Sequence, residues 1–289
     1  MPVQPHIVTF SAVERVFDQA TASQCAHVGR ELARLREADV TVVLCSGRTR
    51  AEQEHLLQRL GVRLPFTTER GAAAFLPREQ FSLPVPKSSE HGEYVVAEFG
   101  QAHRDVLVSL RRAIAVSRMD VRLLSEMSVE DMAQVSGLSL LDARLAKLRE
   151  YSELVWPREA TVSARASFTR ALQAGWLKME PAERGWHVGA MVSPSMAIGL
   201  IREAVRRERG RLVTIGIADE ASSRDVLPLV ERPVRASAQG VDGTHDWSTP
   251  PEMLLRDAID WVDAIADLAD TMVREAVPGR SRLLRSSVV

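Results

Sequence analysis

The sequence predicts an α/β fold in which a mostly parallel sheet carries helices on both faces and a second domain is inserted into it. Short apolar, β-branched runs alternate with helical patterns up to about residue 76, and such alternation is typical of a parallel sheet. The alternation stops after a proline-containing stretch at 77–87 and resumes near residue 194. A chain of 289 residues is long enough to form two domains with substantial cores.

The first part of the chain supplies the start of the sheet. Residues 5–13 are an apolar and β-branched run, which predicts a buried strand. Residues 19–37 carry apolar side chains at helical spacing, and residues 40–45 predict a second buried strand. A helix at 50–60 follows, and then a short strand near residue 66 and another at 72–76.

The middle of the chain differs in character from both ends. We expect a strand at 93–98 and helices at 100–117, 128–135 and 139–151. A helix at 194–208 and a strand at 212–217 then restore the alternation, and an amphipathic helix follows at about 250–275.

These changes divide the chain into four regions. The predicted regions are a first part of the core at 1–82, an inserted α/β cap at 83–187, a second part of the core at 188–247 and a C-terminal helical extension at 248–289.

Charge and composition exclude several classes of partner. The formal net charge of −1 gives no electrostatic reason to expect nucleic acid or an anionic membrane. No apolar run approaches the ~20 residues that span a bilayer, and the first residues lack the pattern of a secretion signal. Cys25 and Cys45 have neither a disulfide framework nor a metal-ligand spacing. We therefore expect a cytoplasmic protein with no nucleic-acid or membrane partner.

Two blocks of sequence resemble a known phosphatase family. Residues 44–52 read Leu-Cys-Ser-Gly-Arg-Thr-Arg-Ala-Glu and residues 69–73 read Glu-Arg-Gly-Ala-Ala, while residues 127–138 and 143–153 form the second block. Over residues 6–247 the chain is similar to the mannosyl-3-phosphoglycerate phosphatases of the haloacid dehalogenase superfamily, which carry Leu-Cys-Thr-Ser-Lys-Thr-Arg-Ala-Glu and Glu-Asn-Gly-Ala-Ala. The resemblance implies a Rossmann-like core with an inserted α/β cap that closes over a sugar-phosphate-type substrate.

The same resemblance implies that the catalytic segments have diverged. The family's first strand carries one aspartate that attacks phosphorus and helps to hold Mg²⁺, and a second that protonates the leaving oxygen. Ser11 and Val13 stand at these positions. Pro194 stands at the position of the family's lysine. In the fourth catalytic segment this chain keeps Asp219, but Ser223 stands at the position of the last carboxylate. Too few oxygen ligands remain for Mg²⁺, so we expect the ancestral fold without the ancestral reaction, and no cofactor.

Several residues are expected to bind a small anionic ester. Ser46 and Thr49 flank a strand-to-helix turn where hydroxyl groups and helix amides receive an anionic oxygen, and Arg48 adds a bidentate fork. The alternative interpretation of the two hydroxyl residues is a helix N-cap. Lys147 and Arg149 lie where the family's cap faces the substrate, and the alternative interpretation of these two residues is a solvated helix face. The expected substrate-binding residues are Ser11, Arg15, Ser46, Arg48, Thr49, Lys147, Arg149 and Arg184.

Three residues are candidates for a catalytic base. Glu14, beside Arg15, lies at the carboxyl end of the first strand, where open α/β sheets bind ligands. The two residues equally fit a salt-bridged plug. His187 lies in a segment that matches the family, and its alternative is a hydrogen-bonded structural histidine. Asp219 is the third candidate, and Asp225 replaces the lost carboxylate if the loop is two residues longer.

Three functions fit these residues. The expected main function is an enzyme that acts without a metal on a sulfate or phosphate ester, by elimination or by intramolecular displacement such as aziridine-type ring closure in specialised metabolism. Such a step needs a base and cations but no enzyme nucleophile. The first alternative is a non-catalytic pseudophosphatase that stabilises a protein partner through its exposed C-terminal helix. The second alternative is a mannosyl-3-phosphoglycerate-type phosphatase with rearranged ligands.

Overall fold

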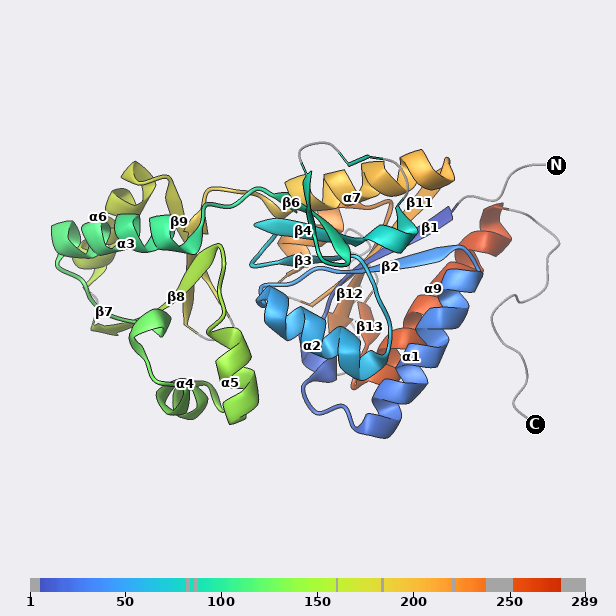
Figure 1. Cartoon of the computed structure of the whole chain (residues 1–289), viewed down its shortest axis with the longest axis horizontal. Helices are drawn as coiled ribbons and strands as arrows, with labels where there is room; N and C mark the ends of the chain where they lie inside the picture. Colours follow the sequence, from blue (N-terminus) through green and yellow to red (C-terminus); the bar gives the residue numbers. More distant parts are fainter. Residues whose placement is uncertain are drawn as a thin grey trace.

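The chain folds into a core domain and a cap that lies beside it (Figure 1). The computed structural model describes residues 6–81, 84–85, 88–159, 161–182, 185–219, 222–237 and 252–276. Within these ranges each domain has its own sheet, of nine strands in the core and four in the cap. No helix in these described ranges is long and apolar enough to cross a membrane.

Three parallel strands form the centre of the core sheet. β1 (His6–Ala12) lies between β2 (Val40–Leu44) and β11 (Leu212–Ala218). The amide of Cys45 donates to the carbonyl of Ser11, and the amide of Asp219 donates to that of Ala12. The carboxyl ends of the three strands therefore meet at one edge of the sheet, as the sequence predicts.

The remaining core strands extend this sheet on both sides. The sheet order is β13-β12-β11-β1-β2-β3-β4-β6-β5. The added strands are β3 (Phe66–Thr68), β4 (Ala73–Pro77), β5 (Ser88–His91), β6 (Tyr94–Glu98), β12 (Arg232–Ser237) and β13 (Glu252–Leu254).

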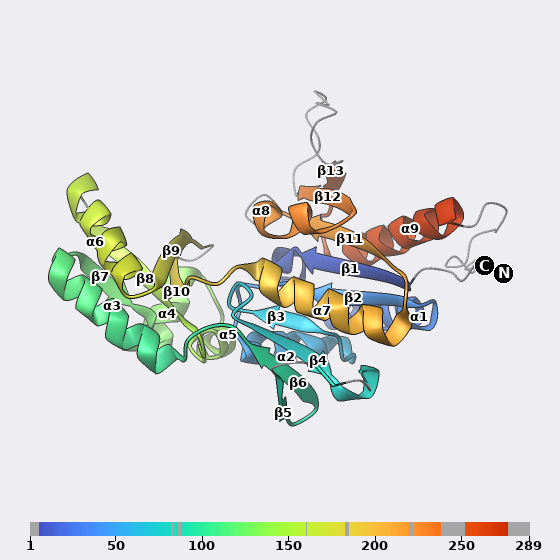
Figure 2. The same ribbon diagram turned by 90° about the horizontal axis from the view of Figure 1, so that it is seen from above.

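Helices cover both faces of the core sheet (Figures 1 and 2). α1 (Ala22–Glu37), α2 (Arg50–Leu60) and α9 (Ala258–Ala276) pack on one face, and α7 (Pro194–Arg209) packs on the other. Thr21 and Thr49 begin α1 and α2 with capping boxes, in which side chain and backbone satisfy each other's free donors. Short helical turns connect other elements: Glu14–Phe17, Arg78–Gln80, α8 (Ser223–Val226) and Leu227–Leu229.

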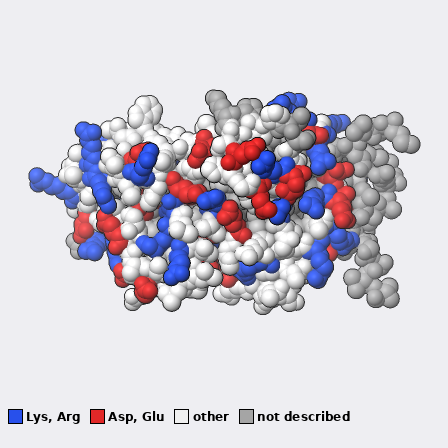
Figure 3. All heavy atoms as spheres, viewed as in Figure 1, with Lys and Arg blue, Asp and Glu red and all other residues white. Residues whose placement is uncertain are grey.

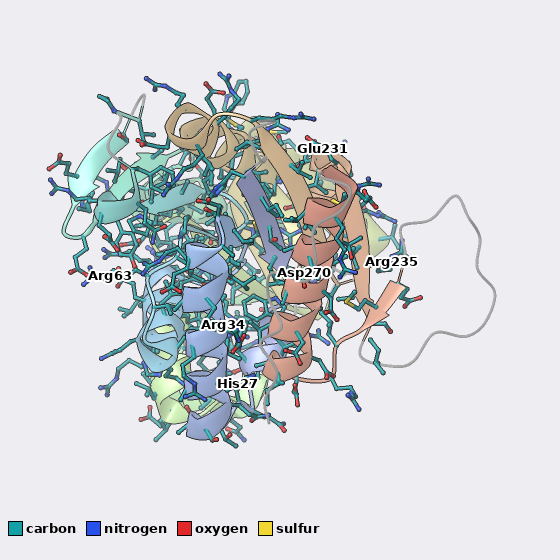
Figure 4. All side chains as sticks on the ribbon, turned by 90° about the vertical axis from the view of Figure 1, so that its right-hand side faces the viewer. His27, Arg34, Arg63, Glu231, Arg235 and Asp270 are labelled. Carbon is teal, nitrogen blue, oxygen red and sulfur yellow. The ribbon has the colours of Figure 1, made fainter. Side chains whose placement is uncertain are left out.

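The C-terminal helix α9 differs from the expectation of an exposed helix. Several of its apolar side chains, among them Trp261 and Ile265, are fully buried in the cluster that also contains α1 and the sheet. Figure 4 shows α9, with Asp270 labelled, alongside α1, with Arg34 labelled. The helix begins at Ala258, because residues 252–254 pair with β12 as a strand. The chain itself therefore covers the apolar face that suggested a protein partner.

The cap is a smaller α/β layer with its own apolar core, which includes Leu110, Phe168 and Leu172. Its sheet has the order β7-β8-β10-β9. The cap elements are α3 (His103–Ser117), β7 (Asp120–Leu123), a turn at Leu124–Glu126, α4 (Val129–Ser136), α5 (Leu140–Ala146), β8 (Ser152–Glu159), α6 (Val162–Ala174), β9 (Leu177–Pro181) and β10 (Trp186–Ala190).

The first domain boundary differs from the prediction of residue 83. β5 and β6 belong to the core sheet, because β6 pairs antiparallel with β4. The change of sequence character after residue 77 therefore marks a hairpin at the sheet edge, and the cap elements begin with α3. On the face shown in Figure 3, the described basic and acidic side chains are interspersed over both domains.

Candidate active site between the core and the cap

A cavity of about 380 Å³ lies where the carboxyl edge of the core sheet faces the cap. Both domains contribute to its lining. The polar residues around it are Arg15, Ser46, Arg48, Glu52, Thr67, Arg70, Arg149, His187, Asp219, Ser222 and Asp225. The sequence predicted six of these: Arg15, Ser46, Arg48, Arg149, His187 and Asp219.

Of the two hydroxyl residues in the turn after β2, Ser46 lines the cavity, whereas the hydroxyl of Thr49 is hydrogen-bonded to other parts of the protein. The hydroxyl of Ser46 accepts from the amide of Arg48 at 2.8 Å. The hydroxyl of Thr49 accepts from the amide of Glu52 at 3.1 Å as the N-cap of α2, and it donates to the carbonyl of Leu145 in the cap at 3.0 Å. Thr49 does not line the cavity. Its capping role, the alternative interpretation, is therefore the one that its contacts support.

Arg48 and Arg15 bring positive charge to the core side of the cavity. The guanidinium of Arg48 is paired with Asp18, at 2.5 Å from its carboxylate. Arg15 follows β1 and is exposed. Glu14 begins the same helical turn, and its side chain lies outside the described part of the structure.

Arg149 enters the cavity from the cap side and is itself almost fully buried. It donates to the carbonyl of Gly47 at 3.1 Å and to the hydroxyl of Ser152 at 2.9 Å. The buried carboxylate of Glu69 lies 3.5 Å from its Nε, and the same carboxylate accepts from the amides of Glu150 and Tyr151. This network fixes the guanidinium at the boundary between the domains.

His187 on β10 is buried against the cavity, and neither ring nitrogen has a hydrogen-bond partner among the described residues. Burial lowers the pKa of His187 well below its usual value, and the charges of Arg149, Arg70 and Lys178 lower it further. The imidazole is therefore neutral at neutral pH. It has one donor and one acceptor to offer a bound molecule.

Two carboxylates lie on the side of the cavity formed by β11 and α8. Asp219 is half-buried, and its Oδ1 accepts from the amide of Ser222 at 2.9 Å. Asp225 accepts from a guanidinium nitrogen of Arg70 at 2.9 Å. Asp225 therefore reaches the cavity, as considered from the sequence, and it is ion-paired there.

Three further expected site residues lie elsewhere or outside the described ranges. Side chains alternate between the two faces of a strand, and that of Ser11 points toward α9, where its hydroxyl accepts from the indole N–H of Trp261 at 2.7 Å. The ammonium of Lys147 donates to the carbonyls of Leu124 and Met127 inside the cap. Arg184 lies outside the described residues.

Arg70 is one of the cavity residues that the sequence did not predict, together with Glu52, Thr67 and Ser222. It lies in the turn between β3 and β4, and its guanidinium contacts Asp225 and the cap residue Glu180. A signal was available, because the resembling family has asparagine where this sequence has Arg70. Because the surrounding motif matches the family, the positive charge that Arg70 adds was overlooked.

The described residues do not fit a Mg²⁺ ion. Ser11 is engaged by Trp261, and Val13 is buried in the apolar core. The carboxylate of Asp225 is committed to Arg70, which leaves Asp219 as the remaining candidate ligand of the ancestral set. Within the described ranges, no group of three His, Cys, Asp or Glu side chains is arranged to hold a metal.

Comparison with known sequences finds sugar-phosphoglycerate phosphatases. The chain is 29% identical over 245 residues to a glucosyl-3-phosphoglycerate/mannosyl-3-phosphoglycerate phosphatase of Methanococcoides burtonii, a match that covers 81% of this chain and 86% of that protein. A mannosyl-3-phosphoglycerate phosphatase of Pyrococcus furiosus is 32% identical over 127 residues, which cover 43% of this chain and 51% of that protein. No protein-family model matches the chain.

Solved structures with a similar fold include a haloacid dehalogenase-like hydrolase and a sucrose-phosphatase. A haloacid dehalogenase-like hydrolase from Bacteroides thetaiotaomicron has a TM-score of 0.57 at 10% identity, covering 92% of this chain and 100% of that one. A sucrose-phosphatase from Synechocystis, in complex with sucrose and phosphate, has a TM-score of 0.55 at 11% identity, with coverage of 92% and 98%. At such identities the likeness concerns the fold alone.

Proposed function

Because the chain belongs to the haloacid dehalogenase superfamily and is similar to its mannosyl-3-phosphoglycerate phosphatases, we propose that it is an enzyme acting on a phosphate or sulfate ester held between core and cap. The substrate is a small molecule whose ester anion points toward the carboxyl edge of the core sheet. Its remaining polar groups point toward the cap.

The observation that carries this proposal is the set of cations around the cavity. Arg15, Arg48 and Arg70 come from the core, and Arg149 comes from the cap. The guanidinium group matches the oxygens of phosphate or sulfate because it donates in a planar fork. Ser46 adds a hydroxyl group at the same edge.

These groups support chemistry in which the enzyme itself forms no bond to the substrate. Arginines aimed at the departing anion stabilise the charge that develops in the transition state, by roughly 2–4 kcal/mol for each well-aimed donor. Asp219, neutral His187 or Glu14 accepts the proton of the attacking group. That group is a water molecule or an atom of the substrate.

Two outcomes of this chemistry are distinguished by the bond that breaks. The comparisons favour hydrolysis of a phosphate ester, in which water attacks phosphorus and the organic alcohol leaves with a proton. The replacements Ser11 and Val13 favour the other outcome, elimination or ring closure. There the carbon–oxygen bond breaks, the anion takes both electrons, and a base removes a proton while a substrate atom closes the ring or a double bond forms.

The pseudophosphatase alternative loses the feature that favoured it. It relied on an exposed C-terminal helix, and α9 is packed against α1 and the sheet.

The test is a reaction in ¹⁸O-labelled water with chelator present or absent. The purified chain is given mannosyl-3-phosphoglycerate and a panel of sugar, glycerate and amino-alcohol phosphate and sulfate esters. Hydrolysis at phosphorus puts ¹⁸O into the released phosphate, whereas carbon–oxygen cleavage releases an unlabelled anion and a cyclised or unsaturated product. We expect turnover that survives the chelator. If no ester is converted or bound, the proposed function is wrong.

A further inference from the structure

The turn between β3 and β4 has an unusual backbone. Glu69 and Arg70 are consecutive residues without glycine's freedom, yet their φ angles are +47° and +62°. Left-handed backbone at two successive side-chain-bearing residues is costly, and it persists only where the surroundings hold it in place. The next residue is Gly71, where an added Cβ would lie 2.6 Å from the Cα of Pro194.

The side chains of this turn hold two different parts of the cap. The carboxylate of Glu69 binds the segment that enters β8, through the amides of Glu150 and Tyr151. The guanidinium of Arg70 reaches the end of β9 instead, where it lies 3.2 Å from the carboxylate of Glu180. One strained turn of the core therefore contacts two of the cap segments that border the cavity.

The contacts of Arg70 are unequal in strength. Its Nη2 donates to the core residue Asp225 at 2.9 Å, and its Nη1 donates to the carbonyl of Pro181 at 3.3 Å. Toward Glu180 the geometry is poorer, because Nε of Arg70 and Oε2 of Glu180 are buried and neither has an aligned hydrogen bond. Arg70 is thus held firmly by the core and loosely by the cap.

We propose that Arg70 couples anion binding in the cavity to the position of the cap strand β9. The inference rests on the proposed function, because it takes a phosphate- or sulfate-bearing ligand as given. A guanidinium has five N–H donors, so Arg70 can bind an anion while it keeps its bond to Asp225. When a bound anion attracts Arg70, the guanidinium brings Glu180 and Pro181 with it, so that β9 is drawn toward the core.

Arg149 does not serve this purpose, although it too lies between the domains. It is nearly fully buried, and Glu69, Ser152 and Gly47 surround its guanidinium. Such a saturated contact anchors the cap in all states. The incomplete contact between Arg70 and Glu180 is the one that anion binding can improve.

The experiment follows amide hydrogen exchange of residues 177–180 in the full chain, with inorganic phosphate or sulfate as the probe. The variants are Arg70→Asn, in which asparagine tolerates the left-handed backbone, and Glu180→Gln, which removes the carboxylate that faces Arg70 and also pairs with Lys178 on the same strand. Arg78→Gln is the control, because Arg78 pairs with Glu90 on the far edge of the core sheet. Calorimetric titration gives the dissociation constant of the probe for each protein.

In the wild type and in Arg78→Gln, phosphate should slow exchange in β9 several-fold. In Arg70→Asn the dissociation constant should rise about tenfold or more, which is the usual effect of losing a charged hydrogen bond, and the slowing should disappear. In Glu180→Gln the dissociation constant should change less than about threefold, because its loss removes no anion-binding group, while the slowing still disappears.

Three results would overturn the inference. If phosphate still slows amide exchange in β9 of the Arg70→Asn protein, or of the Glu180→Gln protein, the coupling is contradicted while the proposed function stays intact. A wild-type protein that binds neither phosphate nor sulfate contradicts the coupling and the proposed function together.

Discussion

A hydrogen bond to Trp261 ties the side chain of Ser11, on the first strand, to the interior of the core domain. In this chain the side chain at the position of the family's nucleophile serves the packing of α9, since it accepts a bond from the buried indole N–H at 2.7 Å. A buried donor without a partner is costly, so this bond constrains residue 11 for stability. The cavity receives Ala12 from this strand, and Ser11 is absent from its lining.

Replacing Ser11 with alanine should lower stability and leave turnover of a bound ester nearly unchanged. The indole N–H of Trp261 would lose its acceptor, which costs about 1–3 kcal/mol of unfolding free energy. Urea denaturation measures this cost, with Ser89→Ala, an exposed residue of β5, as the control that should change stability by less than about 0.5 kcal/mol. A large loss of turnover in a stably folded Ser11→Ala protein would instead place this hydroxyl in the reaction.

At the scale of the element, α9 is a structural part of the core domain. Its apolar stripe was readable from the sequence, because apolar residues recur at helical spacing. The elements that the stripe packs against could not be predicted, since periodicity identifies a buried face without identifying what covers it. The parallel pairing of β13 with β12 brings the chain back beside α1, and the helix then buries Trp261 completely.

Trp261→Ala should therefore destabilise the whole protein. Removing a fully buried aromatic side chain costs about 3–5 kcal/mol of unfolding free energy. Here the hydroxyl of Ser11 also loses the indole N–H from which it accepts a hydrogen bond. The matched control is Trp176→Ala in the cap, because Trp176 is 73% exposed. Urea unfolding followed by circular dichroism separates the two. Equal, small effects from both substitutions would mean that α9 is not packed as described.

For the whole molecule, the sequence predicted the core sheet and its insertion better than it predicted the site. Adjacent parallel strands followed from local patterns, and their shared edge followed from strand direction. The boundary at β5 and β6 was missed because an edge hairpin and a domain linker share the same Pro-rich, polar character. Lys147 was misleading for a related reason, since helical spacing alone does not say which way a cation points.

The site also depended on contacts between residues far apart in the chain. Arg70 pairs with Asp225, 155 positions away, and no local pattern reports that pairing. Conversely, Arg48, Arg149 and His187 were found from segments that resemble the family. Motif comparison located residues that the family already uses, and it passed over a charge that this chain adds.

The cavity is proposed to bind an ester anion through its arginines, without the carboxylates that would hold Mg²⁺. Calorimetric titration of inorganic phosphate into the chelator-treated protein measures this binding. Arg48→Gln is compared with Arg78→Gln, a substitution of an exposed, ion-paired arginine far from the cavity. We expect binding in the presence of chelator, about tenfold or more weaker in Arg48→Gln and unchanged in Arg78→Gln. Binding that appears only after Mg²⁺ is added, or that is indifferent to Arg48, would contradict the claim.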